Sequence, residues 1–192
     1  MPRQSALAST VRTFSGLALA GMIAAGPAQG DVKDPSPGQW SGGAGVGFLA
    51  NSPDGPEFAV AGHGDYFVAP RLSVGPLVQY AGVGNDVVAA LSVQARYWWK
   101  VMARGNVRLV VQGGIGAVVA DIRDTDSGAA DTDTSFVIPV GVGLDYPLTS
   151  RVAVTADFIL NFTSLGEHVH REGREVDLHT NVMPGFFLGV RF

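Results

Sequence analysis

Residues 87–99 read VVAALSVQARYWW, and this stretch decides the fold. Every second residue in it is apolar, while Ser92, Gln94 and Arg96 lie between the apolar positions. Alternation with a period of two is typical of a β-strand with one apolar and one polar face. The stretch therefore predicts a strand whose apolar face consists of Val87, Ala89, Leu91, Val93, Ala95, Tyr97 and Trp99.

The same alternation recurs along the chain from Trp40 onward. Connections rich in glycine, proline, aspartate and asparagine separate the alternating runs, and these residues favour turns. An even number of antiparallel strands is what a single-chain bacterial membrane barrel requires. We therefore predict an all-β fold, an eight-stranded antiparallel up-and-down transmembrane β-barrel. Its strands are predicted at residues 40–50, 58–68, 72–80, 87–99, 107–119, 136–146, 152–162 and 181–192.

The composition favours a membrane barrel over other protein classes. Hydrophobic residues make up 46% of the chain and charged residues 16%, whereas a soluble domain usually carries about 25% charged residues. Beyond the first 30 positions, no uncharged apolar run reaches the roughly 20 residues that a membrane helix needs. A barrel reconciles these facts because it places apolar residues at every second position.

The charges and the lack of cysteine exclude several classes of function. The formal net charge is −4 and no basic face appears, so nucleic acid is not an expected partner. The chain contains no cysteine, which excludes disulfides, thiolate metal sites and a lipidated cysteine. We predict no catalytic, metal-binding or cofactor-binding residue, and no cofactor.

The first thirty residues have the layout of a cleavable signal peptide. Residues 1–12 contain two arginines and no acid, residues 13–25 are apolar, and small residues follow. This order directs export, and the apolar part is too short for a membrane anchor. Cleavage after Ala28 and cleavage after Gly30 both satisfy the small-residue rule. We expect a signal peptide at residues 1–30, a flexible leader at 31–39 and the barrel at 40–192.

Alternation alone does not decide which face meets lipid. The apolar face turns inward in a soluble sandwich and outward in a membrane barrel. The polar face here carries few lysines or glutamates, which a solvated sheet face usually has. We therefore expect the apolar face to meet lipid. Aromatic residues near the predicted strand ends would form belts at the lipid headgroups, and they are Trp40, Tyr97, Trp99, Tyr146, Phe162 and Phe192.

Three acids and three arginines on the polar face balance one another. A charge inside a narrow lumen is costly unless it is paired, and arginine engages a carboxylate through two donors. An eight-stranded barrel is just wide enough for side chains to fill it. We predict a plugged polar interior with a charge network of Asp65, Arg96, Arg108, Asp145, Asp157 and Arg191.

The lengths of the predicted connections indicate an orientation in the outer membrane. With both termini in the periplasm, the connections on that side are residues 69–71, 100–106 and 147–150. The two longest connections then lie outside the cell, as bacterial barrels place them. We expect the external connections at residues 51–57, 82–86, 121–134 and 164–179.

The chain ends MPGFFLGVRF, in which alternate apolar residues lead to a final aromatic residue. This resembles the C-terminal signal by which the barrel-assembly machinery recognises outer-membrane barrels. The match is partial, because Gly185 and Phe187 stand at the usual polar and glycine positions of that signal. The predicted assembly signal consists of Phe186, Leu188, Val190 and Phe192.

Residues 141–158, GVGLDYPLTSRVAVTADF, extend this resemblance. A strand reading glycine-x-glycine-x-acid-tyrosine, a tight turn and a returning strand are similar to the small outer-membrane barrel domains of the OmpA/OmpX type. The residues that carry this likeness are Gly141, Gly143, Asp145, Tyr146 and Phe158. The resemblance covers roughly residues 40–192 and implies outer-membrane lipid, lipopolysaccharide and the assembly machinery as partners.

Three groups of residues carry possible chemistry, each with a plainer interpretation. His168 and His170 form a His-x-His pair that could bind zinc or copper, although a solvated loop is the expected reading. The acidic residues of 121–134 lack the spacing of a calcium loop, so a repelling loop is expected. His63 and Asp65 are the nearest candidates for a serine-activating pair, yet no serine is placed beside them and a structural interior pair is expected.

The function that follows is structural. We expect a monomeric, non-enzymatic outer-membrane barrel that stiffens the membrane or presents loops outside. One alternative is a lipid A-modifying enzyme, an acyl hydrolase or acyltransferase, on the same scaffold. The other is an exported soluble β-barrel that holds a small ligand.

Overall fold

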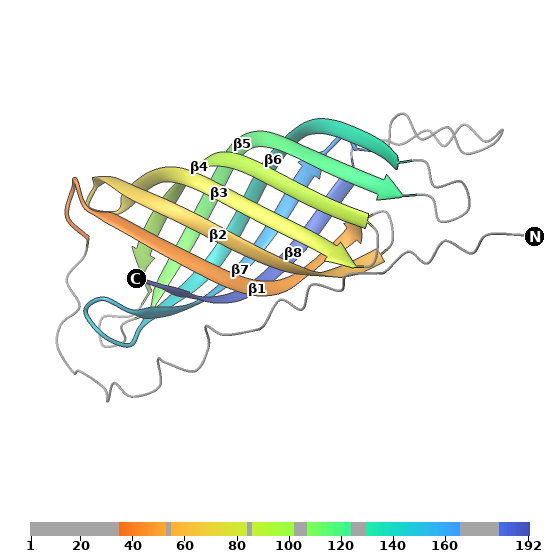
Figure 1. The fold of residues 1–192 in the computed structure, drawn as a ribbon. Coiled ribbons are helices and arrows are strands. Elements are labelled where there is room, and N and C mark those ends of the chain that lie inside the picture. The colour runs from red at the N-terminus through yellow and green to blue at the C-terminus, as the bar shows by residue number, and fades with distance from the viewer. Residues whose placement is uncertain (1–34, 53–54, 84–85, 102–106, 124–129, 166–180) are drawn as a thin grey trace, which may run out of the picture.

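The computed structural model of the chain describes residues 35–52, 55–83, 86–101, 107–123, 130–165 and 181–192. Eight antiparallel strands follow one another around a closed barrel, and the last strand pairs with the first (Figure 1). This confirms the predicted fold class. The strands are β1 (Trp40–Ser52), β2 (Gly55–Ala69), β3 (Leu72–Val83), β4 (Asp86–Lys100), β5 (Arg108–Arg123), β6 (Ala130–Pro147), β7 (Ala153–Thr163) and β8 (Asn181–Arg191).

Side chains alternate between the two faces of the barrel wall, as the period of two predicts. On β4, Val93 is 65% exposed, whereas its neighbour Gln94 is 2% exposed inside the lumen. The outward face is apolar on every strand, with side chains such as Val46 and Ile115 open to the surroundings. No helix in the described part of the chain has the length and apolar character to cross a membrane.

The predicted aromatic residues face outward near the ends of the strands. Trp40, Tyr97, Trp99 and Tyr146 lie toward the end of the barrel that holds the C-terminus, and all are exposed. Phe192 is exposed at the same end, whereas Phe162 on β7 lies toward the opposite end and is half-buried. Trp and Tyr at such positions suit the boundary between hydrocarbon and headgroups.

Two strands continue into the segment that we predicted as an acidic loop. β5 ends at Arg123 and β6 begins at Ala130, with Asp121 opposite Thr132. The prediction of a loop over all of residues 121–134 is therefore wrong at both ends. Aspartate and glycine suggest a turn by composition, but the backbones of the two segments pair as a ladder from Asp121–Thr132 to Arg123–Ala130.

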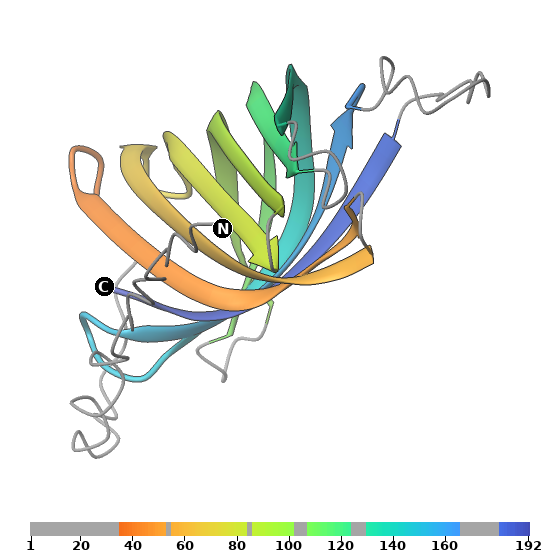
Figure 2. The same cartoon turned by 45° about the vertical axis from the view of Figure 1, so that its right-hand side comes forward.

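The C-terminus closes the barrel against the first strand. Phe192 and Gly42 exchange backbone hydrogen bonds of 2.8 and 2.9 Å, and Ser41 Oγ donates to the Phe192 carbonyl at 3.0 Å. Figure 2 shows the C-terminal end of β8 beside the start of β1. Because every strand is paired on both sides, no sheet edge is open among the described strands.

Candidate functional site

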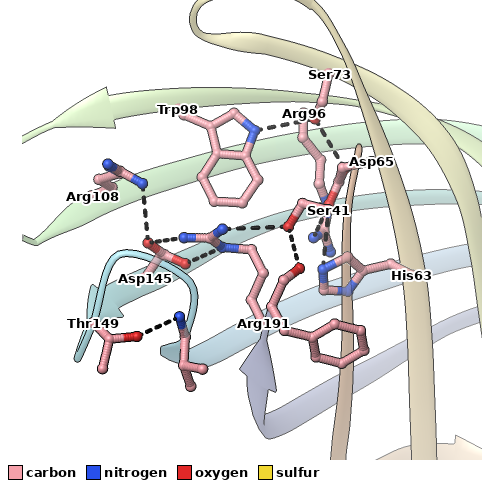
Figure 3. Close-up of polar contacts among 12 residues, drawn as sticks. Ser41, His63, Asp65, Ser73, Arg96, Trp98, Arg108, Asp145, Thr149 and Arg191 are labelled. Carbon is pink, nitrogen blue, oxygen red and sulfur yellow. Dashed lines mark hydrogen bonds and ion pairs between the residues drawn. The ribbon is translucent and has the colours of Figure 1, made fainter. Parts of the chain in front are cut away.

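The candidate site is the lumen, where the buried polar side chains gather. Inward residues from the strand halves near the C-terminus supply all six members of the predicted charge network. Five of them are at most 9% exposed, and the side chain of Arg191 is 12% exposed. The structure brings five of the six together in two clusters, one around Asp65 and one around Asp145 (Figure 3).

The first cluster surrounds Asp65 on β2. Ser73 Oγ donates to Asp65 Oδ1 at 2.9 Å, and Arg96 Nη1 donates to Oδ2 at 3.4 Å. His63 Nε2 lies 3.3 Å from the same Oδ2. Trp98 Nε1 donates to Ser73 Oγ at 3.1 Å, so the indole extends the cluster towards β4. The carboxylate is fully buried and its two oxygens are both engaged.

The second cluster surrounds Asp145 on β6. Arg191 binds it with two donors, Nε to Oδ2 at 2.6 Å and Nη2 to Oδ1 at 3.1 Å. Arg108 Nη1 lies 3.7 Å from Oδ1. Arg191 also donates to Ser41 Oγ at 3.3 Å and stacks 5.2 Å from the ring centre of Trp98. Because Trp98 contacts both clusters, it joins them across the lumen.

Asp157 on β7 belongs to neither cluster. It lies opposite Gly143, and a Cβ atom at Gly143 would collide with its carboxylate. A Cβ atom at Gly43 would likewise collide with the ring of His63. Gly143 and Gly43 therefore leave the room that these two polar side chains occupy, whereas Gly45 and Gly47 on β1 lie against the backbone of β8.

A neutral hydrogen-bonded bridge crosses the lumen farther from the C-terminus than the charged clusters. Gln79 on β3 and Asn161 on β7 exchange two amide hydrogen bonds of 2.9 and 3.1 Å. Asn161 also donates to the Met183 carbonyl at 3.3 Å. These strands lie four places apart in a ring of eight, so the bridge joins opposite walls. Nothing in the sequence distinguished these amides, because their pairing depends on the register of the whole barrel.

The half of the lumen farther from the C-terminus is mostly apolar, which corrects the prediction of a polar interior. Most inward side chains there pack on one another, although Glu57 and Thr163 are also buried at that end. The period of two predicted which residues point inward. It did not predict which inward residues belong to the charged half of the lumen and which to the apolar half. The buried apolar layer consists of Leu49, Ala59, Leu77, Ala81, Val88, Val118, Ala120, Val137, Ile159, Leu165, Met183 and Phe187.

Two small cavities interrupt this packing. Each offers about 10 Å³ to the centre of a water-sized sphere, which is roughly what one water molecule needs. One lies within the apolar layer, between Ala59, Val118 and Met183. The other lies where the apolar layer meets the charged groups, between His63 and Arg96. Neither has the several hundred cubic ångströms of a pocket for an organic ligand.

The arrangement around His63 does not resemble a serine-activating triad. In such a triad the histidine lies between the serine and the acid. Here Ser73 hydrogen-bonds to Asp65 itself, and the three side chains lie within the barrel rather than at a rim. A structural pairing of His63 with Asp65, as we expected, agrees with this geometry.

The candidate metal ligands fall mostly outside the described residues. His168 and His170 lie there, as do Asp124 and Asp126 of the acidic segment. Among the residues that the structure describes, no group of three histidine or acidic side chains could hold a metal ion. The predicted signal peptide and most of the leader, up to residue 34, also lie outside the described part of the chain.

The predicted assembly signal lies on β8. Phe186, Leu188 and Phe192 point outward and are exposed, while Val190 is half-buried. Phe187 points into the lumen and is 2% exposed. The strand pairs with β7 along its whole length and with β1 from Leu49 to Gly43.

Comparisons with solved structures show the same fold. OprG from Pseudomonas aeruginosa superposes with a TM-score of 0.58 at 9% identity, covering 84% of this chain and 98% of that one. Neisserial surface protein A gives 0.56 at 17% identity, covering 79% and 94%. The N-terminal barrel of Pseudomonas aeruginosa OprF gives 0.53 at 15% identity, covering 79% and 97%.

The sequence itself places the chain in a family. No curated protein matches it, but the family model of the outer membrane protein β-barrel domain matches residues 15–181. This match spans most of the chain and agrees with the closed eight-stranded architecture. The chain therefore belongs to the outer membrane protein β-barrel domain family.

Proposed function

We propose that this protein is a closed, non-catalytic barrel that stiffens the bacterial outer membrane and presents its longer connections outside the cell. Membership of the family and the likeness to outer-membrane barrels make the outer membrane its location. The closed lumen, the structural role and the orientation are our proposals.

The observation that carries the proposal is the layering of the lumen. An ion moving along the axis would meet the Gln79–Asn161 bridge, then the clusters around Asp65 and Asp145. It would also have to enter the apolar layer, where a narrow constriction excludes water and therefore ions. These obstacles lie in series, so opening any one of them leaves the others closed.

The ion pairs support a rigid wall rather than a reactive centre. Asp145 is fully buried and held by Arg191 through two short hydrogen bonds. Bidentate pairs of this kind fix geometry as well as adding energy. They tie β6 to β8 across β7, and Arg96 ties β4 to β2 across β3. Such bonds resist the sliding of these strands relative to one another, as a stiff membrane element requires.

The partners in this proposal follow from the outer surface and the resemblance. The apolar outward face suits lipid and lipopolysaccharide all round the barrel, which favours a monomer. The signal peptide would direct export, and the assembly machinery would recognise β8. Both termini would be periplasmic, with the connection between β5 and β6 and the connection between β7 and β8 outside.

The proposal is tested by deleting the gene and restoring it. We expect deletion to lower the stiffness of the cell envelope measured by force microscopy, and expression of the wild-type chain to restore it. Lipid A examined by mass spectrometry should stay the same in both strains. A changed acyl pattern would instead assign the protein to lipid A modification, and unchanged stiffness would contradict the mechanical role.

The orientation of the barrel in the membrane can be tested by labelling single introduced cysteines, because the chain has no cysteine of its own. A single cysteine at Glu172 should react with a membrane-impermeant maleimide on intact cells. A single cysteine at Ser150, in the turn after β6, should react only after the outer membrane is made permeable. Reaction in the reverse order would contradict periplasmic termini.

A further inference from the structure

The cavity where the apolar layer meets the charged clusters has both polar and apolar lining residues. Its polar members are Arg96, His63, Thr155 and Asp157. Its other members are Ala44, Gly45, Ala61, Leu77, Ile159 and Phe187. Its size, about 10 Å³ for the centre of a water-sized sphere, suits a single water molecule.

Two polar atoms of this lining have no hydrogen-bond partner among the described residues. Arg96 Nε is buried and has no hydrogen-bond partner among the described residues, although Nη1 binds Asp65. His63 Nε2 is likewise buried without a hydrogen bond, although it lies near Asp65 Oδ2. The side chains of Arg96 and His63 are only 3% and 7% exposed, so bulk solvent does not satisfy these atoms. A buried donor left unsatisfied is strongly unfavourable.

We propose that this cavity is a binding site for one structural water molecule that joins Asp157 to Arg96 and His63. Water both donates and accepts, so one molecule can accept from the Arg96 Nε–H and donate to the Asp157 carboxylate. Buried waters typically make about three such bonds, and His63 Nε2 supplies the third. The water brings Asp157, the one member of the predicted network outside both clusters, into the cluster around Asp65.

The other cavity provides an internal contrast. It has the same size, but its lining is almost entirely apolar, with Ala59, Val118 and Met183 among its members. Its polar members, Gln79 and Asn161, bind each other. Apolar cavities of proteins stay dry. The two cavities therefore differ in chemistry and not in volume, which allows a matched experiment.

The direct test uses the wild-type barrel in lipid bilayers, labelled with ¹⁵N and ¹³C. Solid-state NMR with a short transfer from water protons should give a signal at Arg96 Nε and at the Asp157 carboxyl carbon. Ala59 Cβ, in the dry cavity, should give none. Absence of transfer to Arg96 Nε and Asp157, in a sample where exposed Arg151 shows it, would overturn the proposal.

A pair of variants on one strand tests the same site by stability. Ala59→Val fills the dry cavity and Ala61→Val fills the polar one, with the same added volume. Ala61→Val should abolish the water transfer at Arg96 and lower the urea midpoint more than Ala59→Val. Ala61→Ser supplies a hydroxyl and should keep the midpoint near that of the wild type. Equal shifts for both valine variants, with the transfer unchanged, would contradict the site; if Ala61→Val does not fold, the wild-type spectrum decides.

Discussion

Gln79 and Asn161 face each other from opposite walls of the barrel and satisfy each other's amides with hydrogen bonds of 2.9 and 3.1 Å. Each residue is buried, at 4% and 2% exposure, beside the apolar layer that begins at Leu77 and Ile159. Bulk solvent does not reach these amides, because both residues are buried. The pair therefore crosses the apolar layer, between Leu77 and Ala81 on β3, without leaving its own amides unsatisfied.

Removing one member of this pair should be worse than removing both. Gln79→Leu leaves the amide oxygen of Asn161 buried without the donor that it has in the wild type, which should lower the free energy of unfolding by about 1–3 kcal/mol. The double variant Gln79→Leu/Asn161→Leu extends the apolar layer and should recover part of that loss. Urea unfolding in lipid vesicles measures the double variant and the two single variants, Gln79→Leu and Asn161→Leu. A double variant whose loss equals the sum of the single losses would show that the pair does not couple.

Neutralising Asp145 should destabilise the barrel more than any surface change. Asp145→Asn removes the charge that Arg191 binds with two donors, and neutralising one partner of a buried ion pair costs about 3–5 kcal/mol. Arg151→Gln changes an exposed residue near the same end and should shift stability by less than about 0.5 kcal/mol. The same urea titration compares them. Similar losses for the two variants would mean that the cluster around Asp145 adds no stability.

A variant at Gly143 tests whether the inner face needs glycine there to make room for Asp157. Gly143→Ala places a Cβ atom against the Asp157 carboxylate, and overpacking of this kind costs about 1–3 kcal/mol. Asp157→Ala in the same chain removes the collision and should restore part of the stability that Gly143→Ala loses. The thermal shift of the heat-modifiable band on gels reports both. If the second change gives no recovery, the backbone of β7 rather than Asp157 limits the space.

The period of two predicted the strands and their inward and outward faces, but not the levels inside the lumen. It placed Ser92, Gln94 and Arg96 on one face of β4, and all are buried. Val88 shares that face, yet it belongs to the apolar layer. Which inward residues meet across the barrel depends on the stagger of eight strands, and one strand's sequence does not contain that information. The contacts of Trp98 with Ser73 and Arg191 were missed for the same reason.

The assignment of the apolar face to lipid has its own test on β4. Val93 is 65% exposed near the middle of the strand, where an arginine facing hydrocarbon costs about 2–4 kcal/mol. Val101 is 52% exposed just beyond the end of the strand, where the same change costs roughly 0–1 kcal/mol. Val93→Arg should therefore unfold at much lower urea in vesicles than Val101→Arg. Equal midpoints would contradict lipid at the level of Val93.

The closed lumen is tested most directly by recording current through planar bilayers that contain the purified barrel. The layered interior predicts no steady open-channel current for the wild type, and none when the Gln79–Asn161 bridge alone is removed, because the charged clusters and the apolar layer remain. Stable, uniform conductance steps from the wild-type protein would contradict the account and make the barrel a pore.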